Sequence, residues 1–312
     1  MRLPLENHLP TLILFEKGQT KMKKNEAQDT GMKPIQVPLE YNYIATFLTF
    51  ACNLKCSYCI NHYEQGIIKR PLMTGREWVK GLNRINSRDD LPVTLQGGEP
   101  SLHPDFIYII NNLKPELNID ILTNLKFDIE DFIKNVDPKR IKRKSPYASI
   151  RVSYHPETMD LDETVAKVLK MLDAHFSIGI WSVMHPAYVK VIEEAKEKCV
   201  KLGIDFRAKE FLGEYQGKLY GCYKYEGSCL KSFRKKVQCR TSEFLMDSQG
   251  NVFKCHSDLY AGASPIGHIL DPEFCIEDKF RECVNFGYCN PCDVKVKTNR
   301  FQQYGYTSVE IK

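Results

Sequence analysis

Short hydrophobic runs recur along the chain from Tyr43 onward, separated by longer segments in which apolar residues return at helical intervals. The runs have the length and the β-branched composition of buried strands. They cover residues 44–50, 93–96, 119–123, 148–154, 178–184 and 204–208. Strands that alternate with helices predict successive βα units around a parallel sheet.

Three of the intervening segments carry clear helix signals. Residues 74–85 begin with Thr74 as a candidate N-cap and Glu77 three residues later, which is the spacing of a capping box. Residues 161–175 and 188–202 have the helical period, and Gly203 is a candidate cap for the latter. Six units are fewer than the eight of a closed barrel. The pattern therefore predicts an α/β fold, a partial (βα)6 TIM-type barrel over residues 43–211.

The segments on either side of this region differ from it in composition. Residues 1–42 are polar and lysine-rich with scattered Pro and Gly, so we expect a loosely ordered N-terminal extension. Of the twelve cysteines, eight lie between Cys222 and Cys292, among Gly, Pro, Tyr and short charged segments. A small loop-rich region of this kind needs disulfides or bound metal for stability, and metal is the candidate here. We expect a separate cysteine-rich domain over residues 212–312.

Composition narrows the class of protein. The chain has 312 residues, 43% of them hydrophobic, and a net charge of +5. The basic runs 139–144 and 231–236 are short and accompany no recognisable binding module, so they predict solvated surface and no nucleic-acid partner. The early apolar run 12–15 is too short for a signal peptide, and no stretch has the length of a membrane span. We expect a cytoplasmic protein whose close-spaced cysteines bind metal.

Cys52, Cys56 and Cys59 lie on one short loop directly after the first predicted strand. Three thiols can hold three corners of a 4Fe-4S cube, and the fourth iron then stays open to an external ligand. The same segment is also compatible with a zinc site, because His62 lies close by.

A second motif, Gly97-Gly98-Glu99-Pro100, directly follows the second predicted strand. The two glycines permit close approach of the backbone to a ligand, Glu99 adds a negative group, and Pro100 ends the strand. Because ligands bind at the carboxyl ends of parallel strands, both motifs are predicted to share one rim of the sheet.

The CxxxCxxC spacing with Tyr58 before the last cysteine, followed by GGEP, resembles the radical S-adenosylmethionine superfamily over residues 43–211. The resemblance implies a 4Fe-4S cluster on the three cysteines, with S-adenosylmethionine bound to the open iron. Reductive cleavage then gives a 5'-deoxyadenosyl radical that abstracts a substrate hydrogen. It also implies that residues 97–100 hold the methionine amino group and that Tyr58 contacts the cofactor.

The resemblance extends to other strand ends. Thr123 and Asn124 match a Thr-Asn element of the family, although Leu125 replaces its usual glycine, and Ser153 lies where relatives place a serine against the cofactor. All three are also compatible with simple capping of strand ends. Further side chains at or near strand ends are candidates for substrate contact or for structural turns: His155, His185, Lys209 and Glu210.

The C-terminal cysteines form a spaced pattern of their own. Cys239 and Cys255 flank Gly250 as C-x10-G-x4-C, and Cys289 and Cys292 form CxxC. This pattern resembles the Twitch extension, the shortened form of the SPASM domain. The resemblance implies an auxiliary 4Fe-4S cluster on these four cysteines, with structural zinc as the alternative.

Five other cysteines have no place in these patterns. Because no cysteine follows Cys292, the seven-cysteine SPASM pattern is incomplete and we expect a single auxiliary cluster. Cys199 fits a helix core position. The remaining four are unassigned, and one of them could replace a predicted ligand or donate a hydrogen atom: Cys222, Cys229, Cys275 and Cys283.

The leading functional hypothesis is an enzyme that dehydrogenates or epimerises a small polar molecule, such as a sugar, an aminocyclitol or a nucleotide-linked sugar. The tyrosine-rich residues 214–227 would line its cavity or form a plain linker. One alternative is modification of a ribosomally made peptide, and another is a non-catalytic iron-sulfur or zinc-binding protein. The chemistry implies a flavodoxin or ferredoxin-type electron donor. The sequence does not identify the substrate, further catalytic residues or the oligomeric state.

Overall fold

The computed structural model describes residues 31–60, 70–263, 265–296 and 307–312, and residues from Met32 onward form one compact unit. Most of the expected N-terminal extension and His62 lie outside the described residues. Among the described residues, no helix is long and apolar enough to cross a membrane.

A nine-stranded sheet organises this unit, in the order β14-β13-β12-β2-β4-β5-β6-β7-β8. Strands β2 to β8 of this order are parallel, and each begins and ends within two residues of a predicted run. The predicted α/β fold with a partial (βα)6 barrel is thereby confirmed. The six strands are β2 (Tyr43–Thr49), β4 (Val93–Gly97), β5 (Ile119–Thr123), β6 (Ile150–Ser153), β7 (Ile178–Met184) and β8 (Phe206–Glu210).

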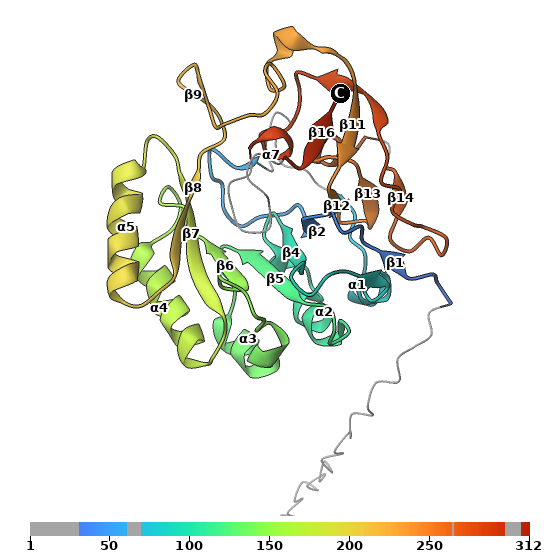
Figure 1. Cartoon of the computed structure of the whole chain (residues 1–312). Helices are drawn as coiled ribbons and strands as arrows, with labels where there is room; N and C mark the ends of the chain where they lie inside the picture. The colour runs from blue at the N-terminus through green and yellow to red at the C-terminus, as the bar shows by residue number, and fades with distance from the viewer. Residues whose placement is uncertain (1–30, 61–69, 264, 297–306) are drawn as a thin grey trace, which may run out of the picture. The chain divides into compact units, whose positions relative to one another are not determined.

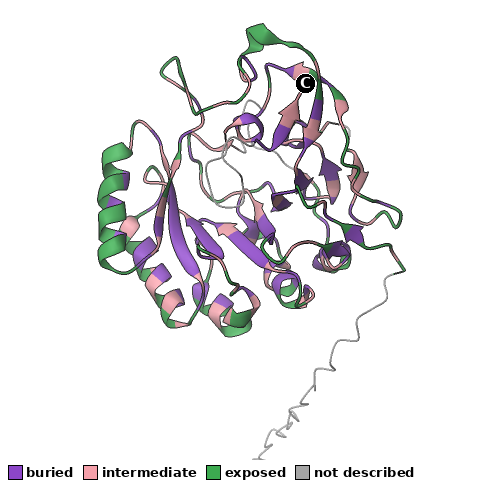
Figure 2. Ribbon diagram, in the orientation of Figure 1, coloured by how far each residue is buried: buried purple, intermediate pink, exposed green. Residues whose placement is uncertain are grey.

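Five helices connect these strands and run along the outside of the sheet (Figure 1): α1 (Gly75–Leu82), α2 (Phe106–Asn112), α3 (Ile129–Asn135), α4 (Leu161–Asp173) and α5 (Val189–Lys201). The capping box of Thr74 and Glu77 is present, and Gly203 follows α5 with φ 75°. Helix α1 is shorter than predicted, because Ile85 belongs to a separate short strand. Figure 2 shows the outer face of α5 exposed and the strands beneath it buried.

The sheet continues beyond the six parallel strands. Strand β12 (Glu243–Met246) pairs in parallel with β2, and β13 (Asn251–Phe253) and β14 (Gly267–His268) add to it antiparallel. Leu245 packs with Ala45 and Phe47 of β2, which explains why this segment joins the sheet. The cysteine-rich region therefore shares a core with the barrel.

The rest of the C-terminal region is small and irregular. Its three-stranded sheet has the order β15 (Arg281–Phe286), β11 (Lys235–Thr241), β16 (Val309–Ile311). Two short helices accompany it, α6 (His256–Ala261) and α7 (Pro291–Val294). A hairpin of β9 (Gly213–Tyr215) and β10 (Lys218–Tyr220) includes the first half of the tyrosine-rich segment. Short 3-10 turns cover Pro100–Leu102, Pro138–Arg140 and Lys231–Phe233.

Part of the expected loose extension is ordered. Strand β1 (Ile35–Gln36) pairs in parallel with β3 (Ile85–Asn86), and Ile35 is fully buried. The difference arises because Ile35 and Val37 alternate with polar residues, so a short strand can bury both in the core.

The run 139–144 also differs from the predicted solvated surface. Arg143 is almost fully buried and binds Asp120 through Nε (2.8 Å) and Nη2 (3.0 Å). Arg140 donates hydrogen bonds to backbone carbonyls of the loop before β5. These two arginines therefore tie loops to the sheet.

Alternation along β6 defines the two faces of the parallel strands. Ile150 and Val152 join the main hydrophobic core together with residues of α3 and α4, such as Phe132 and Val168. Because successive side chains of a strand point to opposite faces, Arg151 and Ser153 face the inner side of the curved sheet. This inner face positions the candidate site.

Candidate functional site

The loop that carries Cys52, Cys56 and Cys59 begins at the carboxyl end of β2, beside the end of β4. Two backbone hydrogen bonds join these ends, from Gly98 N to Thr49 O (2.8 Å) and from Glu99 N to Ala51 O (2.9 Å). The two motifs found in the sequence therefore lie side by side at one rim.

Glycine is required at both positions where this contact forms. A Cβ added to Gly97, whose φ is 152°, would lie 2.0 Å from Thr49 O, and one added to Gly98 would lie 2.2 Å from Ala51 O. A carbonyl oxygen of the backbone cannot tolerate that approach. The two glycines thus admit the backbone of the cysteine loop, and their close approach to a ligand stays a prediction.

Glu99 ties three segments together at this rim. Its carboxylate is fully buried and accepts hydrogen bonds from Thr123 Oγ1 (2.8 Å), Ser101 Oγ (2.7 Å) and the backbone N of Asn124 (2.7 Å). Burial raises the pKa of Glu99, and these hydrogen bonds oppose that shift. Glu99 thus fixes the end of β5 against the end of β4, and Pro100 begins the next short turn.

The Asn124 side chain reaches from the end of β5 to the cysteine loop. Its Nδ2 donates to Asn53 Oδ1 (2.7 Å) and lies 3.8 Å from Cys52 Sγ. The following residue, Leu125, adopts φ 58°, a backbone conformation that favours glycine. The turn after β5 keeps this conformation although leucine occupies the position.

Residues after β6 also support the loop, and sequence reasoning missed them. Thr158 Oγ1 lies 3.5 Å from Cys56 Sγ, and Glu157 accepts a hydrogen bond from the backbone N of Ser57 (2.9 Å). Both follow His155-Pro156, where the histidine alone was a predicted contact. The signal available in the sequence was the polar pair Glu157 and Thr158, which follows closely after the end of β6.

Tyr58 lies in a group of aromatic and histidine side chains. Its ring stacks on His185, with centroids 4.7 Å apart, and its hydroxyl lies 3.2 Å from His155 Nδ1. Burial lowers the pKa of His155 to about 4, so this imidazole is neutral at physiological pH. Tyr215 of the β9-β10 hairpin packs edge-on against His185, at 4.7 Å. The tyrosine-rich segment therefore contributes to the rim.

Two further candidate residues lie at strand ends. Ser153 ends β6 on the inner face and is only partly exposed. Glu210 ends β8 and is exposed.

The electrostatics of the three thiols suit a cationic group. Burial raises the pKa of Cys56 to about 11, and the neighbouring Cys59 and Cys52 add to that rise. Burial also raises the pKa of Cys52, against a hydrogen bond from the backbone N of Leu54 (3.4 Å). Neighbouring thiolates repel one another in a partly buried loop unless metal balances their charge. The donor set therefore fits a metal site.

Arg70 anchors the chain where the described residues resume after the cysteine loop. Its guanidinium lies over the Phe50 ring and pairs with Asp247 (3.1 Å). It also donates to the carbonyl oxygens of Leu259 (2.6 Å) and Tyr260 (3.0 Å) in α6. This contact joins the cysteine loop to the C-terminal region.

Four cysteines of the C-terminal region line a small cavity: Cys239, Cys255, Cys283 and Cys289. Cys239 lies on β11, Cys283 on the neighbouring strand β15, Cys255 caps α6, and Cys289 precedes α7. The expected set contained Cys292 and left Cys283 unassigned. Cys292 lies inside α7 and does not line this cavity, whereas antiparallel pairing of β11 with β15 brings Cys283 beside Cys239.

The thiols of this cavity are strongly coupled. Cys239 donates a hydrogen bond to Cys283, which lowers the pKa of Cys283 and raises that of Cys239. Burial raises the pKa values of Cys255 and Cys289, and nearby Asp293 adds to both. Four thiolates among carboxylates need a cationic group, so this donor set also fits metal.

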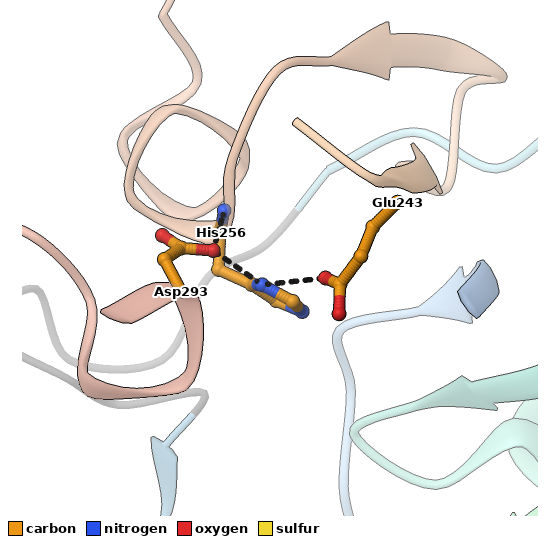
Figure 3. A group of neighbouring side chains, drawn as sticks. All are labelled: Glu243, His256 and Asp293. Atoms are coloured by element: carbon orange, nitrogen blue, oxygen red, sulfur yellow. Dashed lines mark hydrogen bonds and ion pairs between the residues drawn. The ribbon is translucent and has the colours of Figure 1, made fainter. Parts of the chain in front are cut away.

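A buried trio stands beside the cavity (Figure 3). His256 Nδ1 lies 2.8 Å from Asp293 Oδ1 and 3.6 Å from Glu243 Oε2, and Asp293 also accepts from the His256 backbone N (3.0 Å). The three side chains come from α6, α7 and β12. Their contacts fix the two helices that carry Cys255 and Cys292 against the sheet.

A single zinc ion requires closely spaced ligand atoms. A tetrahedral zinc with bonds of about 2.3 Å to sulfur places its thiolates about 3.8 Å apart. Within the described residues, Glu243, His256 and Asp293 are a group of three donors whose atoms all lie within 4.8 Å of one another, and no three cysteines do so.

The other cysteines have varied surroundings. Cys199 is fully buried in α5, as predicted. Cys222 and Cys275 are exposed. Cys229 donates a weak hydrogen bond to Cys289 O (3.4 Å) and so lies close to the cavity.

Comparison with known proteins identifies a family. A family model described as the radical SAM superfamily matches residues 46–205, just over half of the chain. The chain is 36% identical over 70 residues to a GTP 3',8-cyclase of Shewanella denitrificans, which is 22% of this chain and 21% of that protein. It is 29% identical over 158 residues to a probable GTP 3',8-cyclase of Methanocella arvoryzae, 47% of this chain and 48% of that protein.

These matches are partial: they span about a fifth and about half of the length of those two curated relatives. Among solved structures, SuiB of Streptococcus suis aligns with a TM-score of 0.50 and 14% identity, over 78% of this chain and 65% of that chain. At this identity the similarity concerns the fold alone.

Proposed function

Because the chain belongs to the radical SAM superfamily, whose enzymes use a 4Fe-4S cluster and S-adenosylmethionine, we propose that Cys52, Cys56 and Cys59 hold that cluster. We further propose that the enzyme abstracts a hydrogen atom from a small polar substrate inside the barrel. One observation carries this proposal: the cysteine loop is hydrogen-bonded to the Gly98-Glu99 backbone at the carboxyl ends of β2 and β4.

The cluster and S-adenosylmethionine, when bound, supply the electron and the radical that remove a hydrogen atom from the substrate. The residues of the chain hold these groups and keep the site dry. Gly97, Gly98, Glu99 and Pro100 shape the rim beside the loop, and the Asn124 amide orients Cys52. The stacked rings of Phe47 and Phe50, with Tyr260 edge-on to both, exclude water from one side.

Further contacts to S-adenosylmethionine are proposed for Tyr58 and Ser153, and a supporting role for Thr123. Tyr58 lies on the cysteine loop and is held by His185 and His155, which supports a fixed orientation of its ring. Thr123 Oγ1 already donates to Glu99, so its proposed role is to hold that carboxylate. Ser153 lies on the inner face at the end of β6.

We propose that residues 43–211 form the catalytic barrel and that residues 212–312 form a Twitch-like auxiliary region. Its 4Fe-4S cluster would be held by Cys239, Cys255, Cys283 and Cys289, whose common cavity supports this set over the one with Cys292. Four thiolates leave no iron open, so the auxiliary cluster would exchange electrons and not bind S-adenosylmethionine.

The relatives named GTP 3',8-cyclase act on a small phosphorylated molecule by their name, which supports a small polar substrate here. Dehydrogenation and epimerisation both suit a barrel with an auxiliary cluster. A flavodoxin or ferredoxin-type donor and a reducing compartment follow from the proposed clusters, because thiolate ligands must stay reduced.

Formation of 5'-deoxyadenosine by reconstituted, dithionite-reduced protein tests this proposal. We expect wild-type protein to form it and Cys56→Ala to lose at least about 100-fold of that rate, a factor worth about 2.7 kcal/mol. Cys275→Ser, which changes an exposed cysteine outside both sets, is the matched control and should keep the wild-type rate.

Wild-type protein that carries its full iron and still forms no 5'-deoxyadenosine would contradict the proposal. Equal rates for Cys56→Ala and Cys275→Ser would contradict the role of the loop. Deuterium transfer from a labelled substrate into 5'-deoxyadenosine then separates a sugar-like substrate from a peptide.

A further inference from the structure

The inner face of the barrel carries positive charge that neither cysteine group explains. Arg151 lies on β6, Lys209 lies on β8, and Lys295 directly follows α7. Strand alternation places Arg151 on the inner face, opposite to Ile150 and Val152. The register of β6 with β7 and of β7 with β8 places Lys209 on that same face.

Arg151 is buried with incomplete pairing. Its side chain is 8% exposed, and its Nη2 lies 3.2 Å from Asp120 Oδ2. Asp120 is already bound by Arg143 and by the Tyr147 hydroxyl (3.1 Å). Neither Nε nor Nη2 of Arg151 makes a hydrogen bond to a described residue. A guanidinium has five N–H donors, so Arg151 keeps unused donors on the inner face.

The positive charge of Lys209 is less well paired than that of Arg151. Lys209 is partly buried, and within the described residues its ammonium group has neither a hydrogen bond nor an ion pair. Burial lowers its pKa to about 7, and the charges of Arg151 and Lys295 add to that shift, whereas Cys292 opposes it. Cations that repel one another in a partly buried space are stabilised by an anion.

Acidic groups near this face are engaged elsewhere. Glu243 of β12 binds the Ser308 hydroxyl and lies 3.6 Å from His256. Glu210 follows Lys209 along β8 and is exposed, on the opposite face of the strand. Asp120 is shared by two arginines. Arg151 therefore shares Asp120 with Arg143, and Lys209 has no carboxylate partner among the described residues.

We propose that Arg151, Lys209 and Lys295 form an anion subsite that binds a phosphate or carboxylate group of the substrate inside the barrel. The proposal rests on the proposed function, because it assumes that the substrate enters the barrel beside the cysteine loop. The planar guanidinium of Arg151 suits the two oxygens of such a group, and the two lysines add charge. The substrate is thereby an acidic small molecule and not a neutral sugar.

Calorimetric titration of the reconstituted protein with inorganic phosphate, and separately with acetate, tests the subsite at saturating S-adenosylmethionine. We expect Lys209→Met to weaken phosphate binding by about tenfold or more, and Lys209→Arg to restore most of it. Lys196→Met removes an exposed lysine of α5 and is the matched control, with wild-type affinity expected. Preference for phosphate over acetate would identify a phosphorylated substrate, and the reverse preference a carboxylic acid.

A parallel titration without S-adenosylmethionine completes the test. Three results would overturn the subsite: no binding of either anion to wild-type protein in either titration, equal affinity of Lys209→Met and Lys196→Met, or binding that is present only without S-adenosylmethionine. The last would assign the cations to the cofactor. Failure of wild-type protein to form 5'-deoxyadenosine would count against the proposed function alone, because anion binding is measured without turnover.

Discussion

The two cysteine groups of this chain are built in opposite ways. Cys52, Cys56 and Cys59 lie within eight residues of sequence on one loop, and three other segments of the barrel rim support that loop. Cys239, Cys255, Cys283 and Cys289 come from two strands, a helix cap and a loop, and meet only because the C-terminal region folds. One group is a local motif, and the other is a product of tertiary structure.

The two groups also differ in their number of thiols. A loop of three leaves a metal position open to a ligand at the rim, whereas four thiols around a cavity close the metal off. The group proposed to generate the radical lies at the carboxyl ends of the parallel strands. The group proposed for electron transfer lines a small cavity of the C-terminal region.

Cys283→Ala should break the C-terminal group outright and have a larger effect than any other single change proposed below. We expect iron and sulfide to fall from about eight to about four of each per chain after reconstitution, because the auxiliary cluster loses a ligand. Cys292→Ala is the matched change and should keep about eight. Retention by Cys283→Ala with loss by Cys292→Ala would contradict the cavity assignment and restore the CxxC pair.

Glu99→Ala tests how much the stability of the protein depends on the hydrogen bonds that Glu99 accepts at the rim. The change leaves buried donors of Thr123, Ser101 and Asn124 without their acceptor, so we expect unfolding free energy to drop by about 4 kcal/mol. Urea denaturation of the apoprotein measures this. Glu99→Gln keeps the shape and one acceptor oxygen and should lose less; equal losses would show that packing, not hydrogen bonding, dominates.

Arg70→Ala probes the link between the two regions. It removes the partner of buried Asp247 and three further contacts, and we expect a loss of about 3 kcal/mol. Arg76→Ala on the exposed side of α1 is the control and should change stability little. If both variants unfold at the same urea concentration, the regions are held together elsewhere.

Glu163→Gln should have the smallest effect, because the carboxylate is exposed on the outside of the barrel. Hydrogen bonds from Lys126 and Lys167 lower its pKa from 4.5 to about 2. A lowered folded-state pKa stabilises the protein above pH 4.5, and that contribution is lost as the pH falls toward 2. The small stability difference between wild type and variant should therefore shrink on acidification. A difference that grows would contradict the assignment.

Sequence reasoning located the elements and motifs whose signals are local. The strand runs, the Thr74 capping box and the cysteine loop each depend on neighbouring residues, and all agree with the structure. Leu125 shows the limit of this approach, because a leucine adopts the left-handed turn for which glycine was the expected signal.

Features that depend on pairing between distant segments were missed. Cys283 lies near Cys239 because β11 pairs with β15, where Cys283 is opposite Val237, and no spacing in the sequence encodes that register. Strand β12 joins β2 across a long separation for the same reason. Arg143 was predicted to be solvated because its partner Asp120 lies on a preceding strand.

Electron paramagnetic resonance of the reduced protein, with and without S-adenosylmethionine, tests the central contrast most directly. In Cys283→Ala the remaining cluster is the one on the cysteine loop, and its signal should shift when S-adenosylmethionine is added. In the triple variant Cys52→Ala, Cys56→Ala, Cys59→Ala the remaining signal should stay unchanged. A shift in the triple variant and none in Cys283→Ala would contradict the account.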